Sequence, residues 1–274
     1  MRGRAASQRE VMRSVALFAC AWLLLAPAAR GDNREDAAEP AVESPAARDD
    51  GRRTLRRFPA NVLRSAAGVF HADNVGPFLT GGTITAAGSF FDEDVAEYIA
   101  DPEHDFGKSL EDGAAPEVLG LVVAGVFTTG RFVEAPRFRA MSYDLLDAFL
   151  VNGAYTSVLK LAVGRERPNG ENQKSFPSGH TSNAFALAVV VERHYGWKAG
   201  VPAYGLASLV GVSRLQRNKH YLSDVLAGAT LGYVVGRTVV RVNGRPLDDG
   251  RGPRVSFSPV VGRRTRAVVV AVTF

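Results

Sequence analysis

The sequence has almost no cysteine. Cys20 is the single cysteine among the 274 residues, and it lies in an apolar run near the N-terminus. If that run is a leader that is removed, the remaining chain has no thiol. A disulfide framework and a thiolate metal site are therefore both excluded for the rest of the protein.

The chain also lacks a basic domain, although its net charge is +5. The first 29 residues hold four arginines and one glutamate, so the remainder carries 29 basic against 27 acidic residues. Eight of those arginines lie from Arg237 onward, so the high pI comes from the two ends. No motif for reading bases is visible, which excludes nucleic acid as a partner.

Internal repeats are absent, and no strand pattern precedes residue 254. Apolar residues recur instead at helical spacing, and the run from Arg137 to Gly164 predicts a long amphipathic helix. The pattern as a whole predicts an all-α fold, a bundle of about six or seven helices. At the C-terminus, residues 254–262 and 266–274 alternate with period two, which predicts a small β-hairpin tail.

The N-terminal run predicts export. An uncharged stretch from Ser14 to Ala29 follows Arg13 and contains Ala26-Pro27-Ala28, the small-residue pattern of a signal-peptide cleavage site. An uncleaved membrane anchor and a lipoprotein signal at Cys20 are the alternatives. The predicted organisation is a signal peptide at 1–29, a flexible linker at 30–57, a helical domain at 58–243 and the hairpin tail at 244–274.

Long apolar runs are scarce after the leader. The longest uncharged run is Asn74–Phe91, 18 residues with several glycines, whereas a spanning helix needs about 20 apolar residues. We therefore expect a soluble or peripheral bundle in preference to one within the bilayer. The charges that interrupt the other predicted helices are Asp144, Asp147, Lys160, Glu192 and Arg237.

The segment Asp92–Asp112 is acidic. A metal site is one interpretation of these carboxylates, and a solvated helix start followed by a loop is the other. Acidic residues 92–94 suit a helix N-terminus, while Pro102 and Gly107 suit a loop. We prefer the second interpretation.

Three short motifs carry the chemistry. In the first, Lys160 and Arg167 are seven residues apart, which is two helical turns or roughly 10 Å. They would share one helix face, and Pro168 predicts that the helix ends near Arg167. Two cations on a helix face are ordinary by themselves.

The second motif, Pro177-Ser178-Gly179-His180, stands just before a predicted helix. Free backbone N–H groups at a helix start bind anions, and Gly179 lets a ligand approach the backbone closely. The Ser178 hydroxyl can donate as well, and His180 would stand at the rim. A plain helix cap would have the same sequence.

The third motif is Ser213-Arg214, followed by His220 and Asp224. His220 and Asp224 are four residues apart and would lie on one helix face. A carboxylate bonded to one imidazole nitrogen fixes the tautomer and leaves the other nitrogen as a nucleophile. A lone pair of this kind is usually a surface contact.

Taken in order, Lys-x6-Arg-Pro, Pro-Ser-Gly-His and Ser-Arg-x5-His-x3-Asp resemble the type 2 phosphatidic acid phosphatase and vanadium haloperoxidase superfamily. Every motif position is present, and the run Tyr221–Gly228 is also similar. The resemblance extends over about residues 75–240. It implies a helical bundle. Because fixed cations can hold the equatorial phosphoryl oxygens, we expect no metal or other cofactor.

The resemblance also implies the role of each residue. His220 would attack phosphorus and become a phosphohistidine, Asp224 would orient it, and His180 would protonate the leaving oxygen and then activate water. The phosphoryl oxygens would be held by Lys160, Arg167, Arg214, Ser178 and the Gly179 amide. Residues outside the motifs are expected to be surface, mouth or structural residues: Arg165, Arg217, Lys219, His71, His104 and His194.

The predicted function is therefore a metal-independent phosphatase, exported and periplasmic or membrane-associated. Its substrate would be a lipid phosphate, such as phosphatidate or an isoprenyl pyrophosphate, or a small soluble phosphoester. It would meet a membrane surface or lie within the membrane. A vanadium-dependent haloperoxidase and a catalytically silent helical binding protein are the alternatives.

Overall fold

The computed structural model describes residues 51–100, 113–244, 254–261 and 266–273. The predicted signal peptide, Cys20, the linker up to residue 50 and His104 lie outside these residues. Within the described residues the helices run from Leu55 to Gly244, and a two-stranded sheet follows. The fold is all-α, as predicted.

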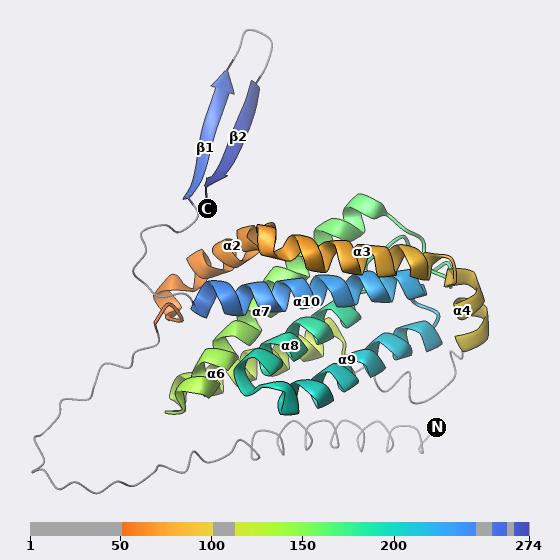
Figure 1. Ribbon diagram of the computed structural model, residues 1–274, viewed down its shortest axis with the longest axis horizontal. Coiled ribbons are helices and arrows are strands. Elements are labelled where there is room, and N and C mark those ends of the chain that lie inside the picture. The colour runs from red at the N-terminus through yellow and green to blue at the C-terminus, as the bar shows by residue number, and fades with distance from the viewer. Residues whose placement is uncertain (1–50, 101–112, 245–253, 262–265, 274) are drawn as a thin grey trace, which may run out of the picture. The chain divides into compact units, whose positions relative to one another are not determined.

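The described residues contain eight α-helices and two short 3₁₀ helices, Leu55–Arg57 and Ala72–Asn74 (Figure 1). Six of the α-helices are at least 15 residues long, which agrees with the predicted number. The α-helices are α2 (Phe58–Gly68), α3 (Val75–Ser89), α4 (Asp92–Ile99), α6 (Pro116–Phe132), α7 (Pro136–Val163), α8 (Gly179–Tyr195), α9 (Trp197–Gln216) and α10 (Leu222–Gly244).

The predicted C-terminal hairpin is also present. Strand β1 (Arg254–Val261) pairs antiparallel with β2 (Arg266–Thr273). The register places Phe257 opposite Val270 and Val255 opposite Val272.

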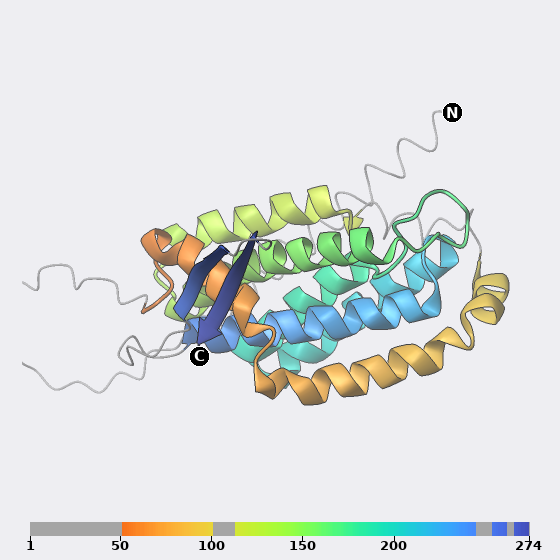
Figure 2. The ribbon, with the colours of Figure 1, turned by 90° about the horizontal axis from the view of Figure 1, so that it is seen from above.

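Helix α10 is the centre of the bundle and packs against α8, α3, α7 and α2 (Figures 1 and 2). Three of its glycines, Gly228, Gly232 and Gly236, are spaced four apart and share one face. A Cβ at Gly232 would lie 2.9 Å from Ala186 N, and one at Gly228 would lie 2.6 Å from Ser178 O. The stripe therefore lets the backbone of α8 approach closely, and it brings the start of α8 beside the first turns of α10.

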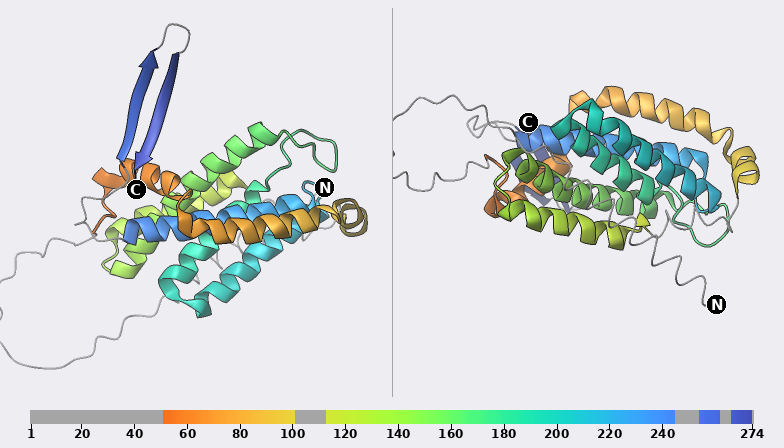
Figure 3. Two further views of the ribbon diagram at one scale, coloured as in Figure 1. Left: turned by 45° about the horizontal axis from the view of Figure 1, so that its top comes forward. Right: turned by 90° about the horizontal axis from the view of Figure 1, so that it is seen from below.

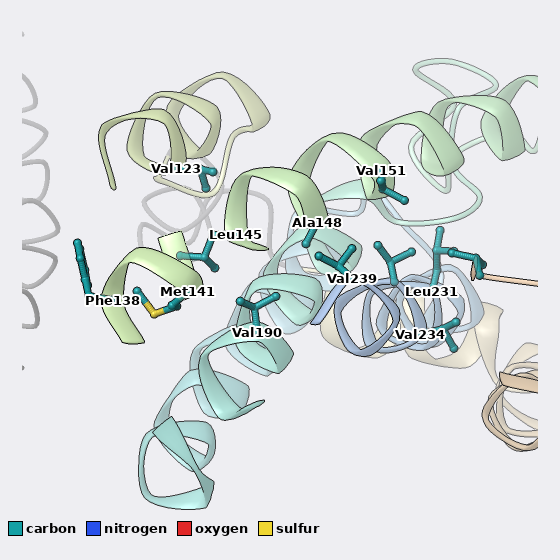
Figure 4. Packing of buried hydrophobic residues seen from close by; sticks show 12 residues of the cluster. Val123, Phe138, Met141, Leu145, Ala148, Val151, Val190, Leu231, Val234 and Val239 are labelled. Carbon is teal, nitrogen blue, oxygen red and sulfur yellow. The ribbon is translucent and has the colours of Figure 1, made fainter. Parts of the chain in front are cut away.

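The apolar core lies between α7, α8 and α10 (Figure 4). Its most buried side chains include Val151, Val190, Val234, Val235 and Val239, each at most 1% exposed. Burying one such side chain contributes roughly 1.5 kcal/mol or more. This core fixes three of the four helices whose ends carry the motifs.

The helical domain begins earlier than the predicted boundary at Phe58. Arg53, placed in the predicted linker, donates to both carboxylate oxygens of Asp144, at 3.0 and 2.8 Å. Few apolar residues precede Phe58, which is why composition suggested a linker. The segment is held by an ion pair to a buried carboxylate instead, and composition cannot show such a contact.

The outer helices α3, α6 and α9 each pack mainly on one inner helix (Figures 1 and 3). Their other faces expose large apolar side chains. Leu79 is 67% exposed, Leu121 is 76% exposed and Val201 is 64% exposed. An apolar surface on several helices is typical of a bundle that associates with a membrane.

Two described helices, α7 and α10, are long and apolar enough to cross a membrane. Two of the charges that weighed against a membrane position, Asp144 and Asp147, lie inside the bundle and are fully buried. Their partners are other side chains of the bundle. These carboxylates therefore do not oppose membrane association, which the exposed apolar faces support.

Candidate active site

The three motifs meet at the end of the bundle where α7 ends and α8 and α10 begin (Figure 2). Residues 164–178 join α7 to α8 there. The short segment 217–221 joins α9 to α10. All eight predicted site residues thus lie on helix ends or connections at this end of the molecule.

Helix α7 ends at Val163, which confirms the helix predicted over Arg137–Gly164. The end near Arg167 that Pro168 suggested lies four residues too late. Gly164 adopts φ +59°, and its amide bonds to Lys160 O at 3.1 Å. Glycine in this left-handed conformation is a common helix terminator, and it stops the helix before Pro168 can. Lys160 is in the last turn, and Lys160 Nζ donates to Lys174 O at 2.6 Å.

Ser178 is the N-cap of α8 and is fully buried. Its amide donates to Asp224 O at 3.0 Å, and its hydroxyl bonds to Thr181 Oγ1 at 2.9 Å. Gly179 and His180 are the first two residues of the helix. Their amides belong to the first turn, whose N–H groups have no partner within the helix and can bind an anion.

His220 is buried, and its Nδ1 lies 2.7 Å from Ser175 O. A carbonyl oxygen only accepts hydrogen bonds, so Nδ1 carries the hydrogen of the neutral ring. The lone pair is then on Nε2. The contact fixes the tautomer that a nucleophilic histidine needs.

Asp224 does not hold His220 directly, which corrects the expectation from the spacing. Asp224 Oδ2 is 3.9 Å from His220 Nδ1. That oxygen accepts from Ser175 Oγ at 2.5 Å and from Tyr221 N at 2.9 Å. The carboxylate therefore orients His220 through the segment around Ser175, which turns its carbonyl toward the ring.

Three cations act on His220. Burial lowers the pKa of His220 well below 6.5, and the charges of Arg214, Lys160 and Arg167 lower that pKa further. Arg214 is 1% exposed. The imidazole is therefore kept neutral in a region of positive charge, where an anion would be attracted.

Lys219, in the segment before His220, has a partner as well. Its Nζ forms an ion pair with the exposed Glu171, which also lies 3.5 Å from Arg167 Nη1. The bond from Lys219 lowers the pKa of Glu171. Lys219 therefore lies beside the site, as a mouth residue would.

Arg165 was expected to be an ordinary surface or mouth charge, and that expectation was wrong. Arg165 Nη1 donates to Asp224 Oδ1 at 2.9 Å, and Nη2 donates to Asp92 Oδ2 at 2.8 Å. Asp92 is likewise not solvated, since it is 4% exposed. Arg165 stands between Lys160 and Arg167, and that position was its one signal in the sequence. Asp92 was noted only as part of the acidic segment, and Ser175 had no signal.

A metal site was the other interpretation of the acidic segment. Among the residues that the structure describes, no three His, Cys, Asp or Glu side chains are grouped so that they could hold a metal ion. Glu93, Asp94 and Glu97 on α4 are exposed. Residues 101–112 lie outside the described part.

Comparison with known proteins agrees with this geometry. The family description "PAP2 superfamily" matches residues 143–246, the span that holds all three motifs. A lipid A 1-phosphatase of Porphyromonas gingivalis is 42% identical over 87 residues, which cover 31% of this chain and 20% of that protein. A probable diacylglycerol pyrophosphate phosphatase of Schizosaccharomyces pombe is 31% identical over 149 residues, which cover 38% of this chain and 53% of that protein.

Among solved structures, a transmembrane PAP2-type phosphatidylglycerolphosphate phosphatase from Bacillus subtilis is 20% identical, with a TM-score of 0.49. The match covers 69% of this chain and 95% of that one. The chain spans between a fifth and just over half of the two curated relatives. The family match covers residues 143–246, which hold all three motifs, so the chain is similar to the PAP2 superfamily over that span.

Proposed function

We propose that the protein is a phosphatase that hydrolyses phosphomonoesters through a phosphohistidine on His220. One observation carries the proposal. His220 is a buried, neutral imidazole whose Nδ1–H donates to a backbone carbonyl, and the charges of three cations lower its pKa. A nucleophile of this kind suits a substrate that brings negative charge with it, as a phosphate ester does.

The first half of the reaction forms the phosphoenzyme. His220 Nε2 attacks phosphorus, the bond from phosphorus to the leaving oxygen breaks, and His180 gives that oxygen a proton. Lys160, Arg167 and Arg214 hold the equatorial oxygens, whose charge must be stabilised in the transition state. The Ser178 hydroxyl and the Gly179 amide add hydrogen bonds.

The second half releases phosphate. His180 takes a proton from water, the water oxygen attacks phosphorus, and the bond from phosphorus to Nε2 breaks. His220 returns to its neutral form with Nδ1–H still on Ser175 O. Fixed cations supply the charge stabilisation, so the proposed mechanism requires no metal.

A lipid phosphate is the substrate class that we favour. The relatives' names refer to lipid A and diacylglycerol pyrophosphate. The exposed apolar faces of α3, α6 and α9 would let the bundle lie within a bilayer, with the site near its surface. Phosphate groups of lipids are found at that depth.

The charge distribution supports a periplasmic site. Exposed basic residues lie before α2, at the start of α7, at the end of α8 and at the start of α9. These helix ends are at the end of the bundle opposite the site (Figure 1). These residues are Arg56, Arg57, Arg137, Arg193 and Lys198. Basic residues favour the cytoplasmic side, which would place the site on the other side of the membrane.

A phosphate-release panel on the purified full chain tests the function. Phosphatidate, diacylglycerol pyrophosphate and p-nitrophenyl phosphate would be compared in detergent, with and without EDTA. We expect turnover that survives EDTA and is highest on a lipid. Bromide oxidation with added vanadate and no phosphate release would favour a haloperoxidase, and inactivity in both assays would favour a silent binding protein.

A further inference from the structure

Asp92 is a buried carboxylate outside the span that the family match covers. It opens α4, and its neighbours Glu93 and Asp94 are exposed. Burying a carboxylate costs several kcal/mol unless its oxygens find partners. The hydrogen-bond partners of Asp92 therefore indicate which part of the molecule it stabilises.

Those partners belong to the candidate active site. Asp92 Oδ1 accepts from Ser223 N at 2.8 Å, and Oδ2 accepts from Ser223 Oγ at 2.6 Å. Ser223 is the second residue of α10, so its amide has no partner within the helix. Asp92 thus caps α10 from another helix and places negative charge at the positive end of its dipole. Helix α10 is the one that carries Asp224.

Arg165 links Asp92 to Asp224. One side of its guanidinium donates to Asp92, and Nη1 donates to Asp224 Oδ1 at 2.9 Å and to Ser223 Oγ at 2.7 Å. The guanidinium also lies over the Tyr221 ring, 4.1 Å from its centroid. A planar fork between two carboxylates fixes both, so Asp224 presents Oδ2 toward Ser175.

The chain of contacts ends at His220. Asp224 Oδ2 holds Ser175 Oγ, and Ser175 N donates to Arg165 O at 2.9 Å. Both contacts fix the residue whose carbonyl sets the tautomer of His220. We propose that Asp92 is a positioning residue for His220 and acts through Arg165, Ser223 and Asp224.

The role rests on the proposed function, because it concerns the attack by His220. The hydrogen bonds of Asp92 in the described residues go to Ser223 and Arg165, not to the three phosphate-holding cations. Loss of the Asp92 charge should therefore slow formation of the phosphoenzyme and leave phosphate binding unchanged. Loss of a residue that only supported the fold would lower the rate of phosphoenzyme formation and phosphate binding together.

Asp92→Asn in the full chain tests this role. Removing an outer-shell partner of a metal-binding histidine costs about 10- to 100-fold in activity, and we take the lower end as the scale for Asp92. We expect kcat on p-nitrophenyl phosphate to fall by about tenfold or more. KM and the inhibition constant for vanadate should stay within about twofold. Glu93→Gln and Asp94→Asn, on exposed neighbours, are the matched controls and should keep wild-type kcat.

Arg165→Lys supplies the second variant, because an ammonium cannot reach both carboxylates as the fork does. It should show the same loss of kcat at constant KM, and the double variant should be no slower than the slower single one. If Asp92→Asn does not fold, Arg165→Lys decides by the same comparison.

Unchanged kcat in a folded Asp92→Asn, or losses that multiply in the double variant, would overturn the positioning role and leave the proposed function standing. Wild-type protein without turnover on any phosphoester would defeat the proposed function, and this role with it.

Discussion

Two buried polar clusters lie at opposite ends of the same helices. At the end away from the site, Asp144 binds Arg53, and His194 Nε2 is 2.8 Å from Asp144 Oδ2. Asn243 joins Asp144 to Asp147, at 2.9 and 2.8 Å, and Ser65 completes this distal cluster. Here opposite charges meet, and each carboxylate has donors around it.

The active-site cluster has a different balance. Its histidine faces a carbonyl rather than a carboxylate, and three cations act on it. The carboxylate of Asp224, beside this histidine, already accepts hydrogen bonds from Arg165, Ser175 and Tyr221. Burial of polar groups is thus common to both clusters, and an excess of positive charge beside a neutral imidazole distinguishes the one suited to bind phosphate.

The largest expected difference between the two clusters concerns their histidines, His220 and His194. His220→Ala should lose all turnover on every phosphoester, because the group that attacks phosphorus is gone. His194→Ala, the matched change in the distal cluster, should keep the wild-type kcat per folded molecule. Phosphate release measured on both variants checks this, and equal losses would contradict the division between the clusters.

His180→Ala should divide substrates by their leaving group. An alkoxide needs the proton that His180 provides, and general acid catalysis is worth about 10²- to 10⁴-fold. A nitrophenolate leaves without help. We expect a loss of about 10³-fold on an alkyl phosphate and a much smaller loss in phosphorylation by p-nitrophenyl phosphate, followed by accumulation of phosphoenzyme. Equal losses on both substrates would assign His180 another role.

Asp144→Asn should affect stability rather than chemistry. Breaking a buried ion pair by removing one charge costs about 3 kcal/mol or more, because the other charge is left uncompensated. The unfolding midpoint in detergent should fall well below that of wild type, while kcat of the folded fraction stays unchanged. A loss of kcat without a loss of stability would show that the distal cluster also serves the reaction.

The smallest expected effect concerns pH. His220 attacks in its neutral form, and its pKa lies well below 6.5. The rate at which p-nitrophenyl phosphate phosphorylates His180→Ala should therefore stay constant as the pH falls through 6.5. It should decline only when the pH approaches the lowered pKa of His220. A midpoint at or above 6.5 would contradict the electrostatics of the site.

The lowered pKa of His220 also makes the stability of the protein depend on pH. Below pH 6.5 the unfolded chain binds a proton at His220 that the folded chain does not. The free energy of unfolding therefore decreases as the pH is lowered from 6.5 to the pKa of His220 in the folded protein. The slope from this group is at most about 1.4 kcal/mol per pH unit.

The sequence predicted which motif residues lie together better than it predicted the contacts that hold them. The motif residues stand within short segments, so their spacing places them near one another once helices are assumed. Asp92 meets Ser223 across 131 residues, and Ser175 meets Asp224 across 49. Contacts of that range depend on how helices pack, and no local pattern encodes them.

Charges inside helices were also hard to interpret from the sequence. Asp144 and Asp147 were counted as interruptions of an apolar helix because an isolated carboxylate suggests solvent. Both are buried, since Arg53 and Asn243 reach them from distant segments. The end of α7 is a different case, because the apolar spacing predicted a helix to Gly164, where a left-handed glycine does end it. Pro168 alone suggested a later end.

The most direct test of the account is to locate the covalent phosphate. Wild-type protein and His220→Ala would be mixed with p-nitrophenyl phosphate, quenched rapidly at high pH and digested, and the phosphorylated peptide would be sequenced by mass spectrometry. The account predicts an acid-labile phosphate on His220 in wild type and none in His220→Ala. Phosphate on another residue, or a labelled His220→Ala, would contradict it.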